Sequence, residues 1–385
     1  MERDGFRPRR RCASGGARRA QIASHRRCVG ARHGAVLHER ESRWALIIGK
    51  IGARRIGDGA PAFILGEVAS AHQGEADQAI ALAKSAQAAG AEAVKFQLFR
   101  AEALVGPNDA NRATFDQIEL SIAEWERVLG EAKALAVPVF ADIFDRRSLD
   151  LGEKMDVAAY KIHSTDMENP AFIHAVAATG KPMLLSTGGS GLGVVEASID
   201  VVRSEGNENL MLLHGVQNFP TKTADSQLRY IETLKRLFGL PVGFLDHVDG
   251  GSEMALMLPA LAVAFGADLV EKHLTLDRAA KGFDYQSALE EDSFRKMVAL
   301  IREAETAFGE PGLVESEGAA RYHASMRRAV LSAVALPQGE PIAEEQLVFL
   351  RNDKGLSPGA AERIVGRKPC RDIAAFEPLT EELFE

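Results

Sequence analysis

The sequence predicts a (β/α)8 barrel followed by a small C-terminal domain, and three observations predict the barrel. Between Pro61 and Gly309, short apolar runs rich in β-branched and aromatic residues alternate with longer helical patterns. Several of these runs are almost continuously apolar, as expected for strands that are covered on both faces. Eight such strand–helix units in a row favour a closed barrel over an open sheet, and no Gly-x-Gly-x-x-Gly motif of a dinucleotide-binding sheet opens the first unit.

The alternation assigns each element in turn. The strands are predicted at Ala62–Val68, Ala93–Phe99, Pro138–Phe144, Ala158–Ile162, Pro182–Ser186, Leu210–His214, Pro241–Leu245 and Asp268–His273. Helical patterns lie at Asp77–Ala89, Glu124–Ala136, Asn169–Ala178, Val195–Ser204, Gln227–Phe238, Glu253–Phe265 and Asp292–Phe308. Glycine follows many of these helices, where the chain commonly adopts a left-handed conformation; the glycines are Gly90, Gly180, Gly206, Gly239, Gly266 and Gly309.

The N-terminal segment differs in composition from the barrel. Residues 1–45 hold 12 arginines against 4 acidic residues and show no apolar periodicity, although the whole chain has a net charge of −8. Low hydrophobicity with clustered like charge predicts a disordered extension or an over-long start assignment, with the functional chain beginning near Ile47. A nucleic-acid-binding arm and a transit peptide are the alternatives.

The segment after Gly309 also changes character. Strand patterns at Arg327–Pro337 and Gln346–Leu350 lie among Gly- and Pro-rich turns, which indicates a small mixed-structure domain. The predicted organisation is therefore an Arg-rich extension (1–46), a barrel (47–309), a charged linker (310–325) and a small domain (326–385).

The remaining composition limits location and partners. Three cysteines cannot build a disulfide framework, and two of them fall in the N-terminal segment, which favours the reducing cytoplasm. The sequence has no apolar run of 18 or more residues, so we expect no membrane span, and we expect no nucleic-acid partner.

Polar residues stand at the C-terminal end of every predicted strand. Barrel enzymes carry their chemistry at this end, so the joint pattern predicts an active site. Along the chain these residues are Glu67; Lys95 and Gln97; Asp142; Lys161, His163, Ser164 and Asp166; Ser186 and Thr187; His214 and Gln217; Asp246 and His247; Lys272 and His273.

Two lysines in this set predict an anion site. Lys95 and Lys161 end the second and fourth strands, with Ser164 and Ser186 nearby to complete the hydrogen bonding of a phosphate or carboxylate. The alternative is a Lys–Glu ion pair across the barrel mouth.

Two histidines predict a metal site. His247 and His273 end neighbouring strands, so both imidazoles can converge on one first-row divalent metal ion such as Mn²⁺ or Zn²⁺. The alternative is that each histidine is a satisfied hydrogen-bonding residue.

An ordered set of motifs resembles the sialic acid synthase family, including its C-terminal antifreeze-like (SAF) domain, from about Ile47 to the C-terminus. In the barrel the motifs are GEVASAHQG (Gly66–Gly74), AGAEAVKFQLF (Ala89–Phe99), KIHSTD (Lys161–Asp166), LLSTGG (Leu184–Gly189), NFPT (Asn218–Thr221), LDH (Leu245–His247) and EKHLTLD (Glu271–Asp277). In the tail they are RRAVLSAVAL (Arg327–Leu336), LRNDKGLSPG (Leu350–Gly359) and GRKPCRDI (Gly366–Ile373).

The resemblance implies a metal-dependent condensation of phosphoenolpyruvate with an open-chain N-acetylated amino sugar. The acceptor would be N-acetylmannosamine or a 2,4-diacetamido hexose, the product a sialic-acid-like nonulosonate plus phosphate, and the metal Mn²⁺ ahead of Co²⁺ or Mg²⁺. The motif KFQLF is closer to the neuraminate and legionaminate branches than to the pseudaminate branch.

The resemblance also implies a role for each matching residue. A domain-swapped homodimer is expected, in which the small domain of one chain covers the other's barrel and Arg351 reaches the acetamido group. The implied catalytic residues are Glu67 and Asp284, the metal ligands His247 and His273, and the substrate-binding residues Lys95, Gln97, Lys161, Ser164, Asp166, Ser186, Gln217, Phe219 and Arg351.

Several positions depart from the family's pattern near the expected phosphate. This chain has Asp142 where the family usually has Thr, Gln217 where it has Asn or Ser, and Leu245 where it has Ser. It also has Ala71 in place of Asn and Phe219 in place of Tyr. Each lost donor costs on the order of 1–3 kcal/mol if a buried phosphate oxygen stays unpaired. Two other functions therefore remain open: a non-catalytic sugar-binding dimer, and phosphoenolpyruvate condensation with another acceptor.

Overall fold

The computed structural model describes residues 49–57, 59–309 and 316–385, which form two compact units that divide between Phe308 and Gly309. The Arg-rich extension predicted at 1–46 and the first part of the predicted linker, 310–315, lie outside the described residues. Within the described residues, no helix is long and apolar enough to cross a membrane.

A closed barrel of eight parallel strands forms the first unit, in the order β10-β3-β4-β5-β6-β7-β8-β9. This arrangement confirms the predicted fold class, and every strand lies within its predicted range to one residue. The strands are β3 (Phe63–Glu67), β4 (Ala93–Leu98), β5 (Val139–Ile143), β6 (Ala159–Ile162), β7 (Met183–Ser186), β8 (Leu210–His214), β9 (Val242–Asp246) and β10 (Leu269–His273).

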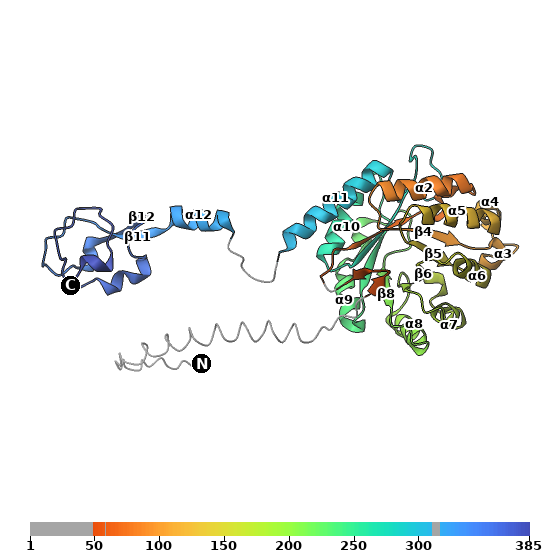
Figure 1. Ribbon diagram of the computed structural model, residues 1–385, viewed down its shortest axis with the longest axis horizontal. Helices are drawn as coiled ribbons and strands as arrows, with labels where there is room; N and C mark the ends of the chain where they lie inside the picture. Colours follow the sequence, from red (N-terminus) through yellow and green to blue (C-terminus); the bar gives the residue numbers. More distant parts are fainter. Residues whose placement is uncertain (1–48, 58, 310–315) are drawn as a thin grey trace, which may run out of the picture. The chain divides into compact units, whose positions relative to one another are not determined.

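Helices surround these strands (Figure 1). They are α2 (Ala76–Ala88), α3 (Ala101–Leu104), α4 (Arg112–Ile118), α5 (Ile122–Ala134), α6 (Arg146–Lys154), α7 (Pro170–Ala177), α8 (Leu192–Ser204), α9 (Arg229–Phe238), α10 (Met254–Ala264) and α11 (Glu291–Phe308). The six glycines predicted to follow helices all have positive φ, between 62° and 96°. Sequence analysis missed α6, which is short and mostly polar; Asp145 caps it by accepting a hydrogen bond from the Ser148 amide at 2.8 Å.

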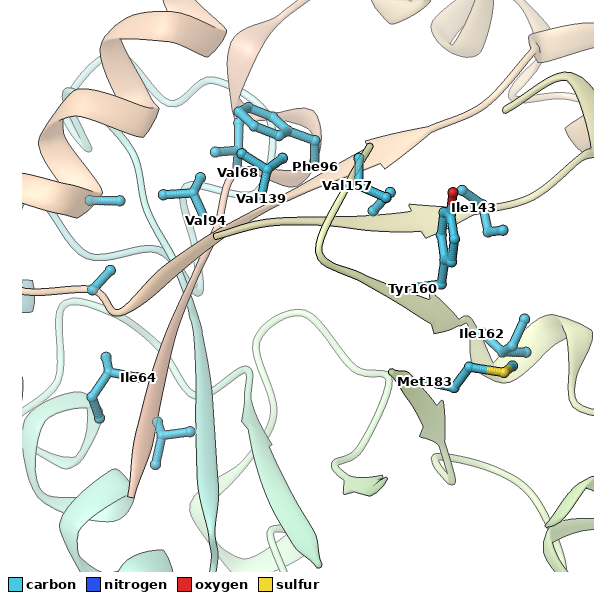
Figure 2. Close-up of a cluster of buried hydrophobic side chains, with 14 of the residues drawn as sticks. Ile64, Val68, Val94, Phe96, Val139, Ile143, Val157, Tyr160, Ile162 and Met183 are labelled. Carbon is cyan, nitrogen blue, oxygen red and sulfur yellow. The ribbon is translucent and has the colours of Figure 1, made fainter. Parts of the chain in front are cut away.

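Side-chain alternation along the strands gives the barrel an inner and an outer apolar layer. The outer layer packs against the helices, and Figure 2 shows part of it, including Ile64, Phe96 and Tyr160. The inner layer contains Phe63, Leu65, Ala93, Phe140, Ala159, Leu184, Met211, Leu213, Leu245 and Leu269. Two residues further along β3, β4, β5, β6 and β10, the same inward face carries charged side chains, so the strand register itself places them in the barrel mouth.

An antiparallel hairpin covers the opposite end of the barrel interior. It consists of β1 (Gly49–Ile51) and β2 (Arg54–Ile56), and sequence analysis did not predict it. Ile51 and Ile56 are buried in the same cluster as the inner apolar layer. Because this end is filled with apolar side chains, the polar C-terminal mouth is the end available to a ligand.

The second unit contains a small antiparallel pair, β11 (Arg328–Ser332) and β12 (Leu347–Arg351), around a compact apolar cluster. Both strands fall close to their predicted positions. The helix α12 (Glu317–Met326) occupies most of the stretch predicted as a linker, and Ser316 caps it by accepting a hydrogen bond from the Ala319 amide at 3.1 Å. This N-cap serine, three residues ahead of the amide that donates to it, is the signal that the sequence analysis overlooked.

Two glycines provide a matched test of this packing. A Cβ at Gly152 in α6 would lie 2.6 Å from the Tyr160 hydroxyl, so Gly152→Ala should lower the free energy of unfolding by about 1–3 kcal/mol. At the exposed Gly130 in α5 a Cβ would meet nothing within 4 Å in the described part of the chain, its own helix backbone aside. Gly130→Ala should therefore raise the free energy of unfolding by about 0.5–1 kcal/mol. Chemical denaturation followed by circular dichroism measures both, and shifts of equal sign would contradict this packing.

Candidate active site

Five charged side chains meet inside the barrel mouth, and we call them the interior charge cluster: Glu67, Lys95, Asp142, Lys161 and Glu271. All five are buried. The Lys95 ammonium contacts Glu67 and lies 3.2 Å from Glu271 Oε1 and 3.5 Å from Asp142 Oδ2. The Lys161 ammonium lies 3.0 Å and 3.2 Å from the same two oxygens. Asp142 and Glu271 thus bridge both lysines.

The charges of the interior charge cluster are paired, but some of its carboxylate oxygens have no hydrogen-bond partner in the part of the chain that the structure describes. Both lysines form ion pairs, as the alternative interpretation of these residues expects. Asp142 Oδ1 and Glu271 Oε2 are nevertheless buried without a hydrogen-bond partner among the described residues. Buried unpaired polar atoms are costly and commonly mark a place where water or a ligand binds. The paired lysines are therefore compatible with a ligand site at the same place.

The two lysines differ in their proton affinity. Burial lowers the pKa of Lys95 to about 8 against the opposing effect of Glu271, and the positive charge of Lys161 lowers it further. Burial also acts to lower the pKa of Lys161, but Asp142 and Glu271 outweigh it, so that pKa is raised. Lys161 is the permanent cation of the pair, whereas Lys95 can lose its proton at moderately alkaline pH.

Two histidines form the other half of the mouth. His247 follows β9 and His273 ends β10, and their ring centroids are 5.1 Å apart. Burial lowers the pKa of His247 to about 3 and that of His273 well below its ordinary value. Both imidazoles are thus neutral at pH 7, which is the form that binds metal ions.

The hydrogen bonding of the histidines fits a metal site. His247 Nδ1 lies 2.8 Å from the Val216 carbonyl, to which it can only donate, so Nε2 carries the free lone pair. His273 Nδ1 is buried and has no partner in the described ranges. Over those same ranges, no group of three or more His, Cys, Asp or Glu side chains is arranged to hold a metal. The protein would therefore supply two imidazoles, with water or substrate oxygens completing the coordination.

The remaining predicted residues of the barrel lie around this centre. Ser186 is buried at the end of β7, and Gln217 Nε2 donates to its hydroxyl at 3.4 Å. Ser164 and Asp166 lie in a single 3-10 turn directly after β6. Gln97 on β4 is in register with Asp142 on β5. Gln97 and Ser186 have the inward strand position of the lysines, whereas contact of Ser164 and Asp166 with a bound anion stays a prediction.

Asp284 and Phe219 line a cavity of about 590 Å³ next to the histidines. The Phe219 ring lies 4.2 Å from the His247 ring and 5.9 Å from the His273 ring, centroid to centroid. Asp284 has a left-handed backbone (φ 62°) and accepts a hydrogen bond from the Ser70 amide at 3.0 Å, while burial raises its pKa. The cavity is also lined by Gln73, from the loop after β3, and by Lys281, Gly282, Phe283, Tyr285 and Gln286 from the loop after β10. Sequence analysis missed the second group because the loop after β10 has no periodicity.

Three of the polar strand-end residues do not face the mouth. Asp246 and Lys272 each follow an inward-facing residue by one position, so their side chains lie on the outward face of their strands. There the Lys272 ammonium pairs with the Asp246 carboxylate at 2.7 Å, and both side chains are fully buried. The His214 Nε2 atom lies 3.0 Å from the Ser226 carbonyl, and its ring packs against Tyr230. The expectation that polar residues at every strand end share one site is wrong for these three, because a one-residue shift along a strand reverses the face.

Sequence analysis also gave no role to His72 or Glu271, and Arg351 belongs elsewhere. His72 is buried against Trp125, and burial lowers its pKa to about 4. Glu271 was quoted as the first residue of the motif EKHLTLD. Its position two residues before His273 was the signal that it points into the barrel, toward the lysines. Arg351 ends β12 in the second unit, so its part in the site stays a prediction.

Comparisons of the sequence and of the structure with known proteins point to the same family. The model of the NeuB family matches residues 82–312. An uncharacterized protein of Methanocaldococcus jannaschii is 32% identical over 84% of this chain and 94% of its own length. The N,N'-diacetyllegionaminic acid synthase of Legionella pneumophila is 30% identical over 87% of this chain and 98% of its own. A crystal structure of N-acetylneuraminic acid synthetase from Leptospira borgpetersenii has a TM-score of 0.67 at 28% identity, covering 73% of this chain and 97% of that one.

The buried neutral histidines predict loss of stability in acid. Their folded-state pKa values lie below the ordinary 6.5, so the unfolded chain binds more protons and stability falls as the pH drops below about 6.5. His72→Gln removes one such group outside the His247–His273 pair. Between pH 7.5 and pH 5 the wild type should lose on the order of 1–2 kcal/mol more than this variant, measured by urea unfolding. Equal losses would show that burial does not lower the pKa of His72 in the folded protein.

Proposed function

Because this chain belongs to the NeuB family, we propose that it condenses phosphoenolpyruvate with an N-acetylated amino sugar, releasing phosphate and a sialic-acid-like nonulosonate. The observation that carries the proposal is the pairing of two inward lysines with two neutral histidines in one barrel mouth. The first pair suits an anionic donor, and the second suits a divalent metal that activates a carbonyl. The Legionella relative, named as a synthase of a diacetylated nine-carbon sugar, supports a similar product.

The donor would bind at the interior charge cluster. Lys95 and Lys161 would hold the phosphate and carboxylate of phosphoenolpyruvate as point charges. Gln97, Ser164 and Ser186 would donate hydrogen bonds to the donor's oxygens. Gln217, which already contacts Ser186, would supply a further amide donor on that side.

His247 and His273 would hold the metal, and their unprotonated nitrogens support this assignment. When bound, a divalent cation supplies Lewis-acid polarisation of the sugar aldehyde. Two imidazoles completed by oxygen ligands suit Mn²⁺ first, with Co²⁺ or Mg²⁺ as the other candidates.

Glu67 would transfer a proton in the reaction, and Asp284 would bind the sugar. In the balanced reaction, C3 of phosphoenolpyruvate bonds to the aldehyde carbon, a water oxygen adds to C2, and the bond from C2 to the phosphate oxygen breaks. Glu67 would take the proton from that water or deliver one to the aldehyde oxygen; the Ala69 amide fixes its Oε1 atom at 2.7 Å. Asp284, in the cavity beside the histidines, would orient the sugar hydroxyls, and Asp166 and Phe219 would complete the sugar contacts.

The small C-terminal unit would complete the site in a domain-swapped homodimer. We assign residues 326–385 to an antifreeze-like domain whose Arg351 binds the acetamido group of a sugar in the partner subunit's barrel. An amide carbonyl is a suitable acceptor for the guanidinium donors of arginine.

One observation favours a second candidate, a sugar-binding dimer without catalysis. Asp142 brings a third carboxylate within 3.5 Å of both lysines, which opposes the binding of an anionic donor. Calorimetry separates the two functions, since the second predicts that the amino sugar binds and that phosphoenolpyruvate does not.

Turnover should require donor, acceptor and metal together. Phosphate should be released from phosphoenolpyruvate only when an N-acetylated amino sugar and Mn²⁺, Co²⁺ or Mg²⁺ are present, and chelation should abolish it. Lys161→Met should reduce kcat/KM by about a hundredfold or more, since it removes a buried cation from the donor site. Absence of phosphate release with N-acetylmannosamine and every 2,4-diacetamido hexose tried would refute the proposed reaction.

Arg351→Ala should raise KM for an N-acetylated sugar by about tenfold or more, because a charged hydrogen bond to the acetamido group is lost. Arg328→Ala is the matched control, since Arg328 is the cross-strand neighbour of Arg351 and is also exposed. If both variants keep the wild-type KM, the acceptor has no acetamido group in contact with Arg351.

A further inference from the structure

Asp142 is the member of the interior charge cluster that the proposed reaction does not use. It lies on β5 between the two lysine-bearing strands, in register with Gln97 on β4 and Lys161 on β6. Its side chain is fully buried, and its Oδ2 atom is 3.2 Å from the Lys161 ammonium and 3.5 Å from the Lys95 ammonium. Asp142 therefore occupies the position from which a bound anion would contact both lysines at once.

The charge balance of the cluster depends on this residue. With Glu67 and Glu271 alone, two carboxylates would balance two ammonium groups. Asp142 adds a third carboxylate and gives the cluster a formal charge of −1 while the neighbouring histidines are neutral. A phosphate entering this site meets lysines that are already paired and an excess of negative charge at close range, which opposes binding strongly in a buried site.

The same contacts stabilise the protein without ligand. A buried ammonium without a counter-ion is strongly unfavourable, and each lysine would lose one of its partners if Asp142 were neutral. Asp142 contacts the ammonium groups of Lys95 and Lys161. The other titratable groups around it are Glu271, which pairs with both lysines, Glu67, which pairs with Lys95, and the His163 ring, on which the charge of Asp142 acts.

We propose that Asp142 is an internal counter-ion that takes the place of the phosphate in the free protein and competes with it for Lys95 and Lys161. It keeps both lysines buried, charged and oriented between turnovers. It also weakens the hold on phosphate, which favours release of the phosphate product. This inference rests on the proposed function only in identifying the competing anion as the phosphate of the donor and product.

The experiment is a calorimetric titration of inorganic phosphate, and separately of phosphoenolpyruvate, into three forms of the full-length chain without sugar. Asp142→Asn removes the charge at constant size, and Asp142→Thr provides a second, smaller neutral side chain. Both variants should bind phosphate about tenfold or more tightly than the wild type. Both should also unfold at a lower temperature without phosphate and regain part of that loss when phosphate is added.

A matched control separates competition from a purely structural role. Asp268 is also a buried carboxylate paired with a lysine, Lys235 at 2.8 Å, but it precedes β10 at the opposite end of the barrel. Asp268→Asn should lower the unfolding temperature and leave phosphate affinity unchanged. If the folded Asp142 variants bind phosphate no more tightly than the wild type, or no form binds it, Asp142 is not a competing counter-ion.

The outcome is distinguishable from failure of the proposed function. Phosphate binding requires neither acceptor nor turnover. Tighter phosphate binding by the Asp142 variants, together with a wild type that never consumes phosphoenolpyruvate, therefore supports the counter-ion and refutes the synthase. Active enzyme with unchanged phosphate affinity in the Asp142 variants does the reverse.

Discussion

The buried pairing of Lys95 and Lys161 with three carboxylates is the interaction on which the rest of the structure depends. Charges can be buried at this depth only when each has a partner within a few ångströms. The closed barrel provides such partners, because strands distant in sequence, β5, β6 and β10, bring inward side chains to the same level. The apolar layer below and the β1–β2 hairpin fill the rest of the interior, so the charges lie at the one open, polar end.

The lysines also influence the histidines beside them. Burial is the main cause of the lowered pKa of His273, and the charges of Lys95 and Lys161 lower it further. The two ammonium groups therefore help to keep the His273 imidazole neutral, which is the state that a metal requires. In this way one cluster of charges supports both halves of the proposed reaction: anion binding on the lysine side and carbonyl activation on the histidine side.

The sequence predicted the barrel well because its signals are local. Apolar runs located all eight strands, and glycines located the helix ends. The inward residues Glu67, Lys95, Lys161, His247 and His273 were found because they stand at strand ends. The same reasoning wrongly grouped Asp246 and Lys272 with them, since it collected every polar residue at a strand end without asking which face the alternation of side chains gives it. The cavity loop around Lys281 and Tyr285 and the β1–β2 hairpin carry no periodic signal, so only three-dimensional packing reveals them. Helix α6 does have an amphipathic pattern and an N-cap at Asp145, but it is short, and the sequence analysis overlooked it.

The most direct test of the central claim is mass spectrometry of the product formed from phosphoenolpyruvate and an N-acetylated amino sugar in the presence of a divalent cation. The proposed chemistry predicts one new product whose mass equals that of the sugar plus the elements of one molecule of pyruvic acid. With labelled water, its heavy oxygen should appear in that product and not in the released phosphate. Recovery of the unchanged sugar, or label in the phosphate through cleavage of the phosphorus–oxygen bond, would contradict it.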